Sequence, residues 1–291
     1  MTQYVANGLA AGAQIGILAL GFGLIYRTGK VLHFAHAASF LVGAYGVVLA
    51  RQFMSNSPFL ITVGVGVLLS CIFGLLVELL IYRPLRARGS SGIQIFIASL
   101  GIYVFVQNMI SWIAGDDPIA YFPGTMTKTM HIVNAAVTVP QIVGLAVFLI
   151  TLAVVFSFVS ATRLGIFSKA VASDHDIARA VGLPVGKVHI TAMCAGATMA
   201  GLAGIIVAWD TILIPSMAIH PLMLSVVAVF IGGKSFLGPA YGAVAVGVIL
   251  HLSVLVVPTR WQEMTTLIVL VAFLLVRSLG SFNTQVEGPT I

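Results

Sequence analysis

Long uninterrupted apolar runs dominate this sequence and restrict what the chain can fold into. A helix needs about 20 predominantly apolar residues to cross the hydrocarbon core of a bilayer. Runs of this kind recur from residue 6 to residue 279, separated by short polar segments. Charged residues make up only 8% of the 291 residues, whereas a soluble domain carries roughly a quarter. The composition therefore excludes a water-soluble globule, a disordered chain and a disulfide-rich scaffold.

The apolar runs predict an all-α, polytopic transmembrane helix bundle with eight or nine spans. Backbone groups in lipid must satisfy their own hydrogen bonds, as they do in helices, and the runs are too long and too uniformly apolar for barrel strands of about 10 residues. The seventh run is short and contains Pro221, so it is either a span or part of a broken or re-entrant segment. The predicted spans are 6–26, 32–50, 59–82, 93–114, 138–160, 188–209, 217–232, 238–257 and 263–279.

The distribution of basic residues predicts how the bundle is oriented. Loops on the cytoplasmic side of a membrane protein carry an excess of Lys and Arg. With nine spans, eleven of the 14 basic residues fall in one set of loops and three in the other, which places the N-terminus outside and the C-terminus inside. The inner set is Arg27, Lys30, Arg83, Arg86, Arg88, Arg163, Lys169, Arg179, Lys187, Lys234 and Arg277, and the outer set is Arg51, Lys128 and Arg260.

The inner loop between the fifth and sixth spans predicts a short helix outside the membrane. Helix-forming residues run from about Ala170 to Val181, and Gly182 follows where such a helix would end. Apolar side chains beside charges, with no span to pack on, suit a helix that docks a soluble partner; a plain connector is the alternative. The residues predicted to contact that partner are Asp174, Asp176, Ala178 and Gly182.

Polar residues inside the spans are candidates for lining a transport path, because such residues usually face the bundle interior or a water-filled cavity. His33 and His36 lie three residues apart, on one face of a helix. No third ligand is close in sequence, so we expect no metal site there; a structural polar pair at a helix start is the alternative. Polar groups in the fourth span can equally hold helices together. The predicted pathway residues are His33, His36, Ser39, Gln107 and Asn108.

Glu78 is a further ionisable group within a predicted span, about one turn before Tyr82. A carboxylate near a helix end can reach basic side chains that follow it. We therefore expect an ion pair with Arg83 or Arg86 rather than a proton relay.

The sequence lacks the motifs of membrane enzymes, such as His-Glu-x-x-His and Gly-x-Ser-x-Gly. The stretch from Phe230 to Ser235 resembles the end of a phosphate-binding loop, but Ala228 stands where that pattern needs glycine, and a span rather than a strand precedes it. We therefore expect a transport subunit with no catalytic residue and no cofactor of its own. Its energy source is then either an ion gradient or a separate ATPase.

The chain resembles the permease subunits of the branched-chain amino-acid ABC importer family, which also includes urea and short-amide permeases. The resemblance covers nearly the whole chain. His33 replaces the usual Asn and Ala37 the usual Gly, so the substrate need not be a branched-chain amino acid. The matching segments are Leu24 to His36, similar to the family's Tyr-Gly followed by Asn-Phe-Ala-His-Gly; Tyr82-Arg83-Pro84-Leu85-Arg86; Gly101 to Asn108; Asp176 to Gly182, where the family has Glu-x-Ala-x-x-x-Gly; and Ala200 to Gly204.

The resemblance implies one transmembrane permease domain over 1–291, with a cytoplasmic coupling segment at about 163–187, in the inner membrane of a bacterium. The implied partners are a homologous second permease, two cytoplasmic subunits that use ATP and Mg²⁺, and a periplasmic substrate-binding protein. The implied cargo is a small polar nutrient such as an amino acid, urea or an amide. The alternative is a gradient-driven secondary transporter or channel, with His33 and His36 as proton-sensitive groups.

Overall fold

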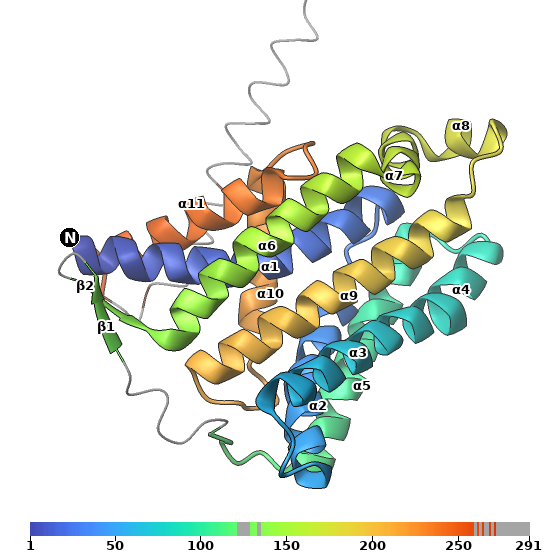
Figure 1. The fold of residues 1–291 in the computed structure, drawn as a ribbon. Helices are drawn as coiled ribbons and strands as arrows, with labels where there is room; N and C mark the ends of the chain where they lie inside the picture. Colours follow the sequence, from blue (N-terminus) through green and yellow to red (C-terminus); the bar gives the residue numbers. More distant parts are fainter. Residues whose placement is uncertain are drawn as a thin grey trace, which may run out of the picture.

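A computed structural model describes residues 1–120, 129–132 and 135–258, together with the single positions 261, 264, 268 and 271. This part of the chain is a bundle of helices with one small hairpin (Figure 1). The predicted ninth span, 263–279, lies outside the described residues apart from three single positions, and Lys128, Arg260 and Arg277 lie outside them as well.

The first eight predicted spans each correspond to a helix at nearly the predicted position. Five helical stretches in the described part are long and apolar enough to cross a membrane, namely Thr2–Gly29, Phe59–Ala87, Gly92–Ala114, Val139–Ala161 and Val185–Asp210. The helices of the bundle are α1 (Thr2–Gly29), α2 (Ala35–Phe53), α3 (Phe59–Val77), the π-helical turn η1 (Glu78–Tyr82), α4 (Arg83–Ala87), α5 (Gly92–Ala114), α6 (Val139–Ala161), α7 (Arg163–Ser173), α8 (His175–Ala180), α9 (Val185–Asp210), α10 (Ile219–Ile231) and α11 (Gly238–Ser253).

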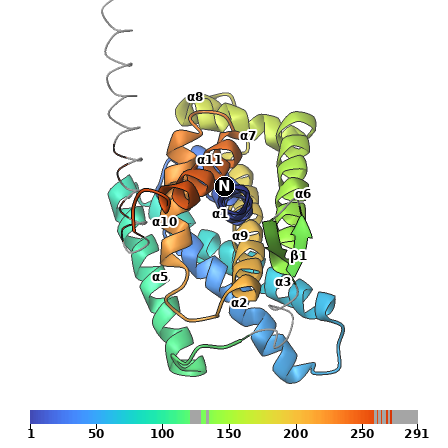
Figure 2. The ribbon, with the colours of Figure 1, turned by 90° about the vertical axis from the view of Figure 1, so that its left-hand side faces the viewer.

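The first helix, α1, lies at the centre of the bundle. It packs against α11, α9, α10 and α6, and Figure 2 looks along it. Glycines allow this close packing: a Cβ atom added to Gly8 or Gly12 would lie within 2.9 Å of the α11 backbone. Small residues at helix contacts are how membrane helices approach closely without a hydrophobic driving force between them.

A second close contact joins α2, α3 and α9. A Cβ atom on Gly43 of α2 would lie 2.3 Å from the Cα of Gly201 in α9, and one on Gly66 of α3 would lie 2.5 Å from the carbonyl oxygen of Gly43. Beside this contact, the Ser70 hydroxyl of α3 is 2.9 Å from the carbonyl oxygen of Ser39 and 2.6 Å from that of Ala197. Contacts with α3 and α9 therefore hold the first half of α2 rigidly in the interior.

The seventh predicted span is formed by α10 together with the irregular segment before it. With 13 residues, α10 is only about 20 Å long, too short to cross the bilayer alone. Leu213, before the helix, pairs with Ile119 beyond the far end of α5. Gly233, after the helix, accepts a hydrogen bond from Arg27 at the last turn of α1. The segment thus runs from one end of the bundle to the other, as a span does, and is not re-entrant.

The connection between α5 and α6 contains an antiparallel hairpin. Its strands are β1 (Thr129–Ile132) and β2 (Ala135–Thr138), with Thr129 opposite Thr138. Gln3 of α1 makes two hydrogen bonds with the Ala136 backbone. The hairpin is therefore fixed to the N-terminal end of the bundle, whereas α7 and α8 lie at the opposite end (Figure 1).

Candidate functional site

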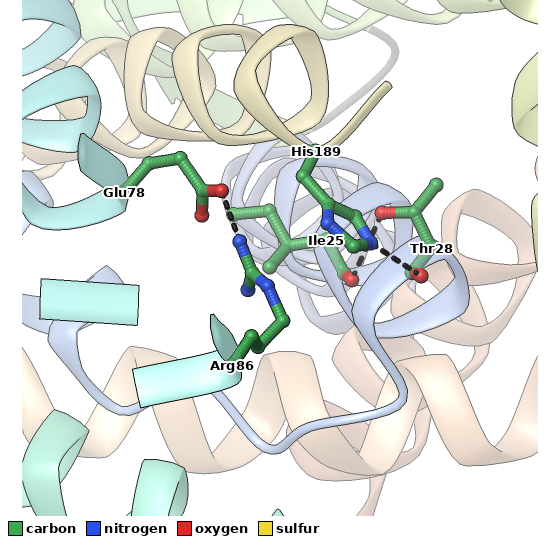
Figure 3. Close-up of polar contacts among 5 residues, drawn as sticks. All are labelled: Ile25, Thr28, Glu78, Arg86 and His189. Carbon is green, nitrogen blue, oxygen red and sulfur yellow. Dashed lines mark hydrogen bonds and ion pairs between the residues drawn. The ribbon is translucent and has the colours of Figure 1, made fainter. Parts of the chain in front are cut away.

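Polar side chains gather at the end of the bundle where α1 ends and α9 begins (Figure 3). They enclose a cavity of about 20 Å³, which is comparable to the space that one water molecule needs. A buried group of this kind is unusual in an apolar bundle, because each polar atom must find a partner. We call this group the polar cluster: Thr28, His33, Glu78, Tyr82, Arg86 and His189.

The wide turn η1 supplies two members of the polar cluster. Glu78 and Tyr82 are 1% and 3% exposed. The turn ends two residues before Pro84, whose missing N–H removes a helical hydrogen bond. Glu78 forms an ion pair with Arg86, as we predicted. The Tyr82 hydroxyl lies 2.6 Å from Nδ1 of His33. Turns of this kind are frequent at functional sites. Through its side chains, this one contacts Arg86 in α4 and His33, two residues before α2 begins.

His189 connects three further elements. Its Nε2 donates to the carbonyl oxygen of Thr28 at 3.2 Å, which ties α9 to the end of α1. Its ring stacks on that of His175 in α8, with centroids 5.5 Å apart and an angle of 13° between the planes. The short helix α8 therefore reaches the polar cluster through one side-chain contact. His189 was not among the predicted site residues, because no short-range sequence pattern relates it to Thr28, 161 residues away in the chain.

Three of the predicted pathway residues lie together near the start of α2. His33, His36 and Ser39 are at most 2% exposed. Nε2 of His36 donates to the carbonyl oxygen of Leu18 in α1 at 3.1 Å, whereas its Nδ1 is buried without a partner among the described residues. The Ser39 hydroxyl lies 3.4 Å from the carbonyl oxygen of Ala35. In the described chain, helices enclose this group on every side.

The other two predicted pathway residues are not part of this group. Asn108 is exposed on α5, and its amide donates to the carbonyl oxygen of Val104 in the same helix at 2.7 Å. Gln107 is half-buried on the same turn. The prediction grouped these amides with the histidines by residue type, but the rotation of α5 places Asn108 on the outer surface of this chain.

The predicted coupling segment forms two helices instead of one. Oδ1 of Asp174 accepts hydrogen bonds from the backbone N–H groups of Asp176 and Ile177, both at 2.9 Å. An N-terminal cap of this kind starts a new helix, so the single helix that we predicted over about 170–181 is wrong. The end of α8 is as predicted, since Gly182 follows it with a φ of 79°, a conformation that favours glycine.

The burial of Ala178 contradicts its predicted role in docking. Ala178 is 3% exposed and packs with Val171 and Val188 in a small core below α8, so it cannot contact a partner. Ile177 and Val181 are instead 63% and 68% exposed. Their spacing of four residues places them on one face of α8, beside the exposed carboxylate of Asp176.

A pocket of about 660 Å³ separates α8 and the start of α9 from α4. We call it the α8 pocket. Arg83, Arg179 and Lys187 line it, together with the Glu78–Arg86 pair. Among the described residues, no group of three His, Cys, Asp or Glu side chains is placed to hold a metal ion. This end of the bundle therefore has an open, basic pocket next to α8, the helix that exposes Ile177 and Val181.

A family model described as the permease component of the branched-chain amino acid transport system matches residues 4–274. The chain belongs to this permease family. LivH of Salmonella typhimurium, a high-affinity branched-chain amino acid transport system permease protein, is 25% identical to this permease over 96% of this chain and 94% of its own length. BraD of Pseudomonas aeruginosa, with the same description, is 24% identical with the same coverage. A probable ABC transporter permease of Sinorhizobium fredii, y4mJ, is 27% identical over 94% of this chain and 80% of its own. No solved structure shows a significant match.

Family membership decides between an ion gradient and a separate ATPase as the energy source. The permease is a multi-pass membrane protein and the membrane-spanning subunit of an ABC importer. It is a transport component and not an enzyme, and the ATPase of such systems is a separate subunit. A gradient-driven transporter is thereby set aside.

Proposed function

We propose that this permease imports a small polar nutrient, an amino acid or an amide, across the inner membrane of a bacterium. The family match over 4–274 is the observation that carries the proposal, and the branched-chain amino acid permeases among its relatives support the cargo class. The partners are a homologous second permease, a periplasmic binding protein and two subunits that bind ATP and Mg²⁺. His33 departs from the family pattern, so the cargo class remains broader than branched-chain amino acids.

In this proposal, residues 1–291 act as one transmembrane domain, and the end that carries α7 and α8 faces the cytoplasm. Eight basic residues of the predicted inner set line two pockets at this end. The positive-inside rule favours the cytoplasm for that end. The hairpin of β1 and β2 then faces the periplasm, where it lies on the side of the binding protein.

The helix α8 is the proposed contact with the ATPase subunits. Ile177 and Val181 expose an apolar pair beside Asp176, and apolar anchors within a polar rim are typical of protein interfaces. The small core of Val171, Ala178 and Val188 supports α8 from below. Such support lets a push on α8 move α7 and α9 instead of deforming the short helix.

The polar cluster is the proposed route from α8 to the transport path. His175 of α8 stacks on His189 of α9, which holds the carbonyl of Thr28 at the end of α1. Seven residues after Thr28, α2 begins, with the buried His33 just before its first residue and His36 in its first turn. A displacement of α8 is thus transmitted through direct contacts to both sides of the α1–α2 connection. Variants at His36 and at the exposed side chains of α8 test the two ends of this route.

Copurification and reconstitution test the proposed function. Expressed with the proteins encoded beside it, the permease should copurify with two ATP-binding subunits, and liposomes containing the complex should take up substrate only with ATP and the binding protein. Uptake by the permease alone, driven by an ion gradient, would contradict the proposal.

His36 tests the path end of the route. In His36→Ala, we expect uptake per assembled complex to fall about tenfold or more, because the variant removes the unpartnered Nδ1 together with the Nε2 that bonds to the Leu18 carbonyl, and one lost hydrogen bond costs about 0.5–1.5 kcal/mol. Ser70→Ala is the matched control, since Ser70 is equally buried and also bonds only to backbone. It should lower stability but leave uptake per complex unchanged. Equal uptake in the two variants would exclude His36 from the path.

A further inference from the structure

A second pocket at the same end of the bundle has no role in the transport cycle described above. It has a volume of about 680 Å³ and lies between the end of α1, the end of α7 and the turn from α10 to α11. No Asp or Glu is among the described residues that line it. We call it the tetrabasic pocket, after its four cationic side chains, Arg27, Lys30, Lys169 and Lys234.

Arg27 is the buried member of this set. It is 7% exposed, and one terminal nitrogen donates to the carbonyl oxygen of Gly233 at 2.8 Å. Its Nε is buried and has no partner among the described residues. Part of its charge is stabilised by the C-terminus of α1 and by the ring of Phe236, 5.5 Å from the guanidinium carbon. The positive charge of Arg27, held in the pocket wall by the Gly233 carbonyl, therefore attracts an anion into the pocket.

Three lysine ammonium groups lie close to Arg27 in the same pocket. Lys30 donates to the carbonyl oxygen of Ala172 at 2.7 Å, which brings it toward Lys169 on α7, and Lys234 follows directly after Gly233. Like charges held close together repel one another. The α8 pocket holds one carboxylate, Glu78, which pairs with Arg86, whereas no Asp or Glu among the described residues lines the tetrabasic pocket. The tetrabasic pocket therefore has an uncompensated positive charge that an anion would balance.

The lining also indicates which kind of anion fits. A guanidinium and several ammonium groups suit phosphate oxygens, which accept several hydrogen bonds at once. Tyr26, Phe230 and Phe236 form the apolar part of the wall, as an amphipathic ligand requires. The pocket lies at the end of a membrane-spanning helix, and basic pockets between such helices on the cytoplasmic side bind phospholipid headgroups.

We propose that the tetrabasic pocket binds a phosphate group, supplied by the headgroup of an anionic phospholipid. The lipid would link α1, α7 and the α10–α11 turn, and so brace the coupling segment against the bundle. Binding there does not depend on the identity of the cargo.

Native mass spectrometry of the purified complex, titrated with phosphatidylglycerol, phosphatidylcholine or inorganic phosphate, tests this site. The test variant is the triple change Lys30→Gln, Lys169→Gln and Lys234→Gln, which leaves the structural Arg27 in place. We expect wild-type complex to bind phosphatidylglycerol in preference to phosphatidylcholine. Each lysine removed should weaken that binding about fivefold, and all three roughly 100-fold. Inorganic phosphate that binds and competes would assign the site to free phosphate, with the same chemistry.

A control of equal net charge separates the pocket from the general basicity of this end. Arg83→Gln, Arg88→Gln and Lys187→Gln remove three charges outside the tetrabasic pocket and should leave binding within about twofold of wild type. Equal weakening in both triple variants would overturn the proposal, because it would mean attraction by net charge alone. Absence of binding by the assembled complex would also overturn it.

Discussion

Replacing both Ile177 and Val181 with glutamate should reduce ATP-driven uptake by the reconstituted importer about 100-fold or more. The two side chains form the exposed apolar face of α8, and truncation of a residue at the centre of an interface costs about 2 kcal/mol or more. Two carboxylates placed there would also have to be buried without partners, which adds to this cost. The measurement is substrate-stimulated ATP hydrolysis and uptake, together with the ratio of copurified ATPase subunits.

Conservative changes at the same two positions provide the control. Ile177→Leu with Val181→Ile keeps the apolar face and should retain uptake within about twofold of wild type. The membrane bundle of the glutamate variant should melt at the wild-type temperature, because neither side chain packs in its core. Normal coupling in the glutamate variant would mean that α8 is only a connector between α7 and α9.

Sequence reasoning located the spans because they depend on local properties. Length and apolar composition decide whether a segment can cross a bilayer, and each of the first eight predicted spans agrees with a helix within a few residues. The pairing of Glu78 with Arg86 was predictable for the same reason, since the two residues lie eight positions apart at one helix end. The glycine after α8 was predictable from its preference for positive φ.

Sequence reasoning failed where rotation or tertiary contact decides the outcome. Ala178 was assigned to the docking surface because the pattern around it is apolar, but Asp174 starts α8 anew and turns Ala178 inward, onto Val171 and Val188. Asn108 was grouped with the buried histidines because it is polar, but it lies apart from them, exposed on α5, with its amide nitrogen bonded to Val104 in the same helix; its place in the path stays a prediction. In a membrane helix both faces are apolar, so periodicity does not indicate which face is buried.

The polar cluster could not be predicted either, because its members are far apart in the sequence. His189 and Thr28 are 161 residues apart in sequence, and nothing near either residue indicates the other. The stacking of His175 on His189 depends on how α8 folds back over α9. Such sites can be found only when the packing of the helices is known.

A second substitution with a large expected effect tests the packing of α2 against α9. We expect Gly43→Ala to destabilise the permease strongly enough to lower its melting temperature and its folded yield. A Cβ atom at Gly43 would lie 2.3 Å from the Cα and 2.7 Å from the carbonyl oxygen of Gly201. Both neighbours are backbone atoms, so no side-chain rotation can relieve the clash, and α2 and α9 must move apart. Overpacking costs about 1–3 kcal/mol even where neighbours can shift, and we expect a cost at or above that range here.

Gly64→Ala in α3 is the matched control, because a Cβ atom at Gly64 meets nothing within 4 Å. Alanine in a helix is normally favoured over glycine by roughly 0.5–1 kcal/mol, so this variant should melt at or slightly above the wild-type temperature. Replacing glycine with alanine is therefore expected to lower the melting temperature at position 43 and to leave it unchanged or slightly raised at position 64. Equal melting temperatures would show that α2 and α9 are not in backbone contact. In that case the rigid interior position of His36 and Ser39, on which their proposed place in the transport path depends, would have no structural basis.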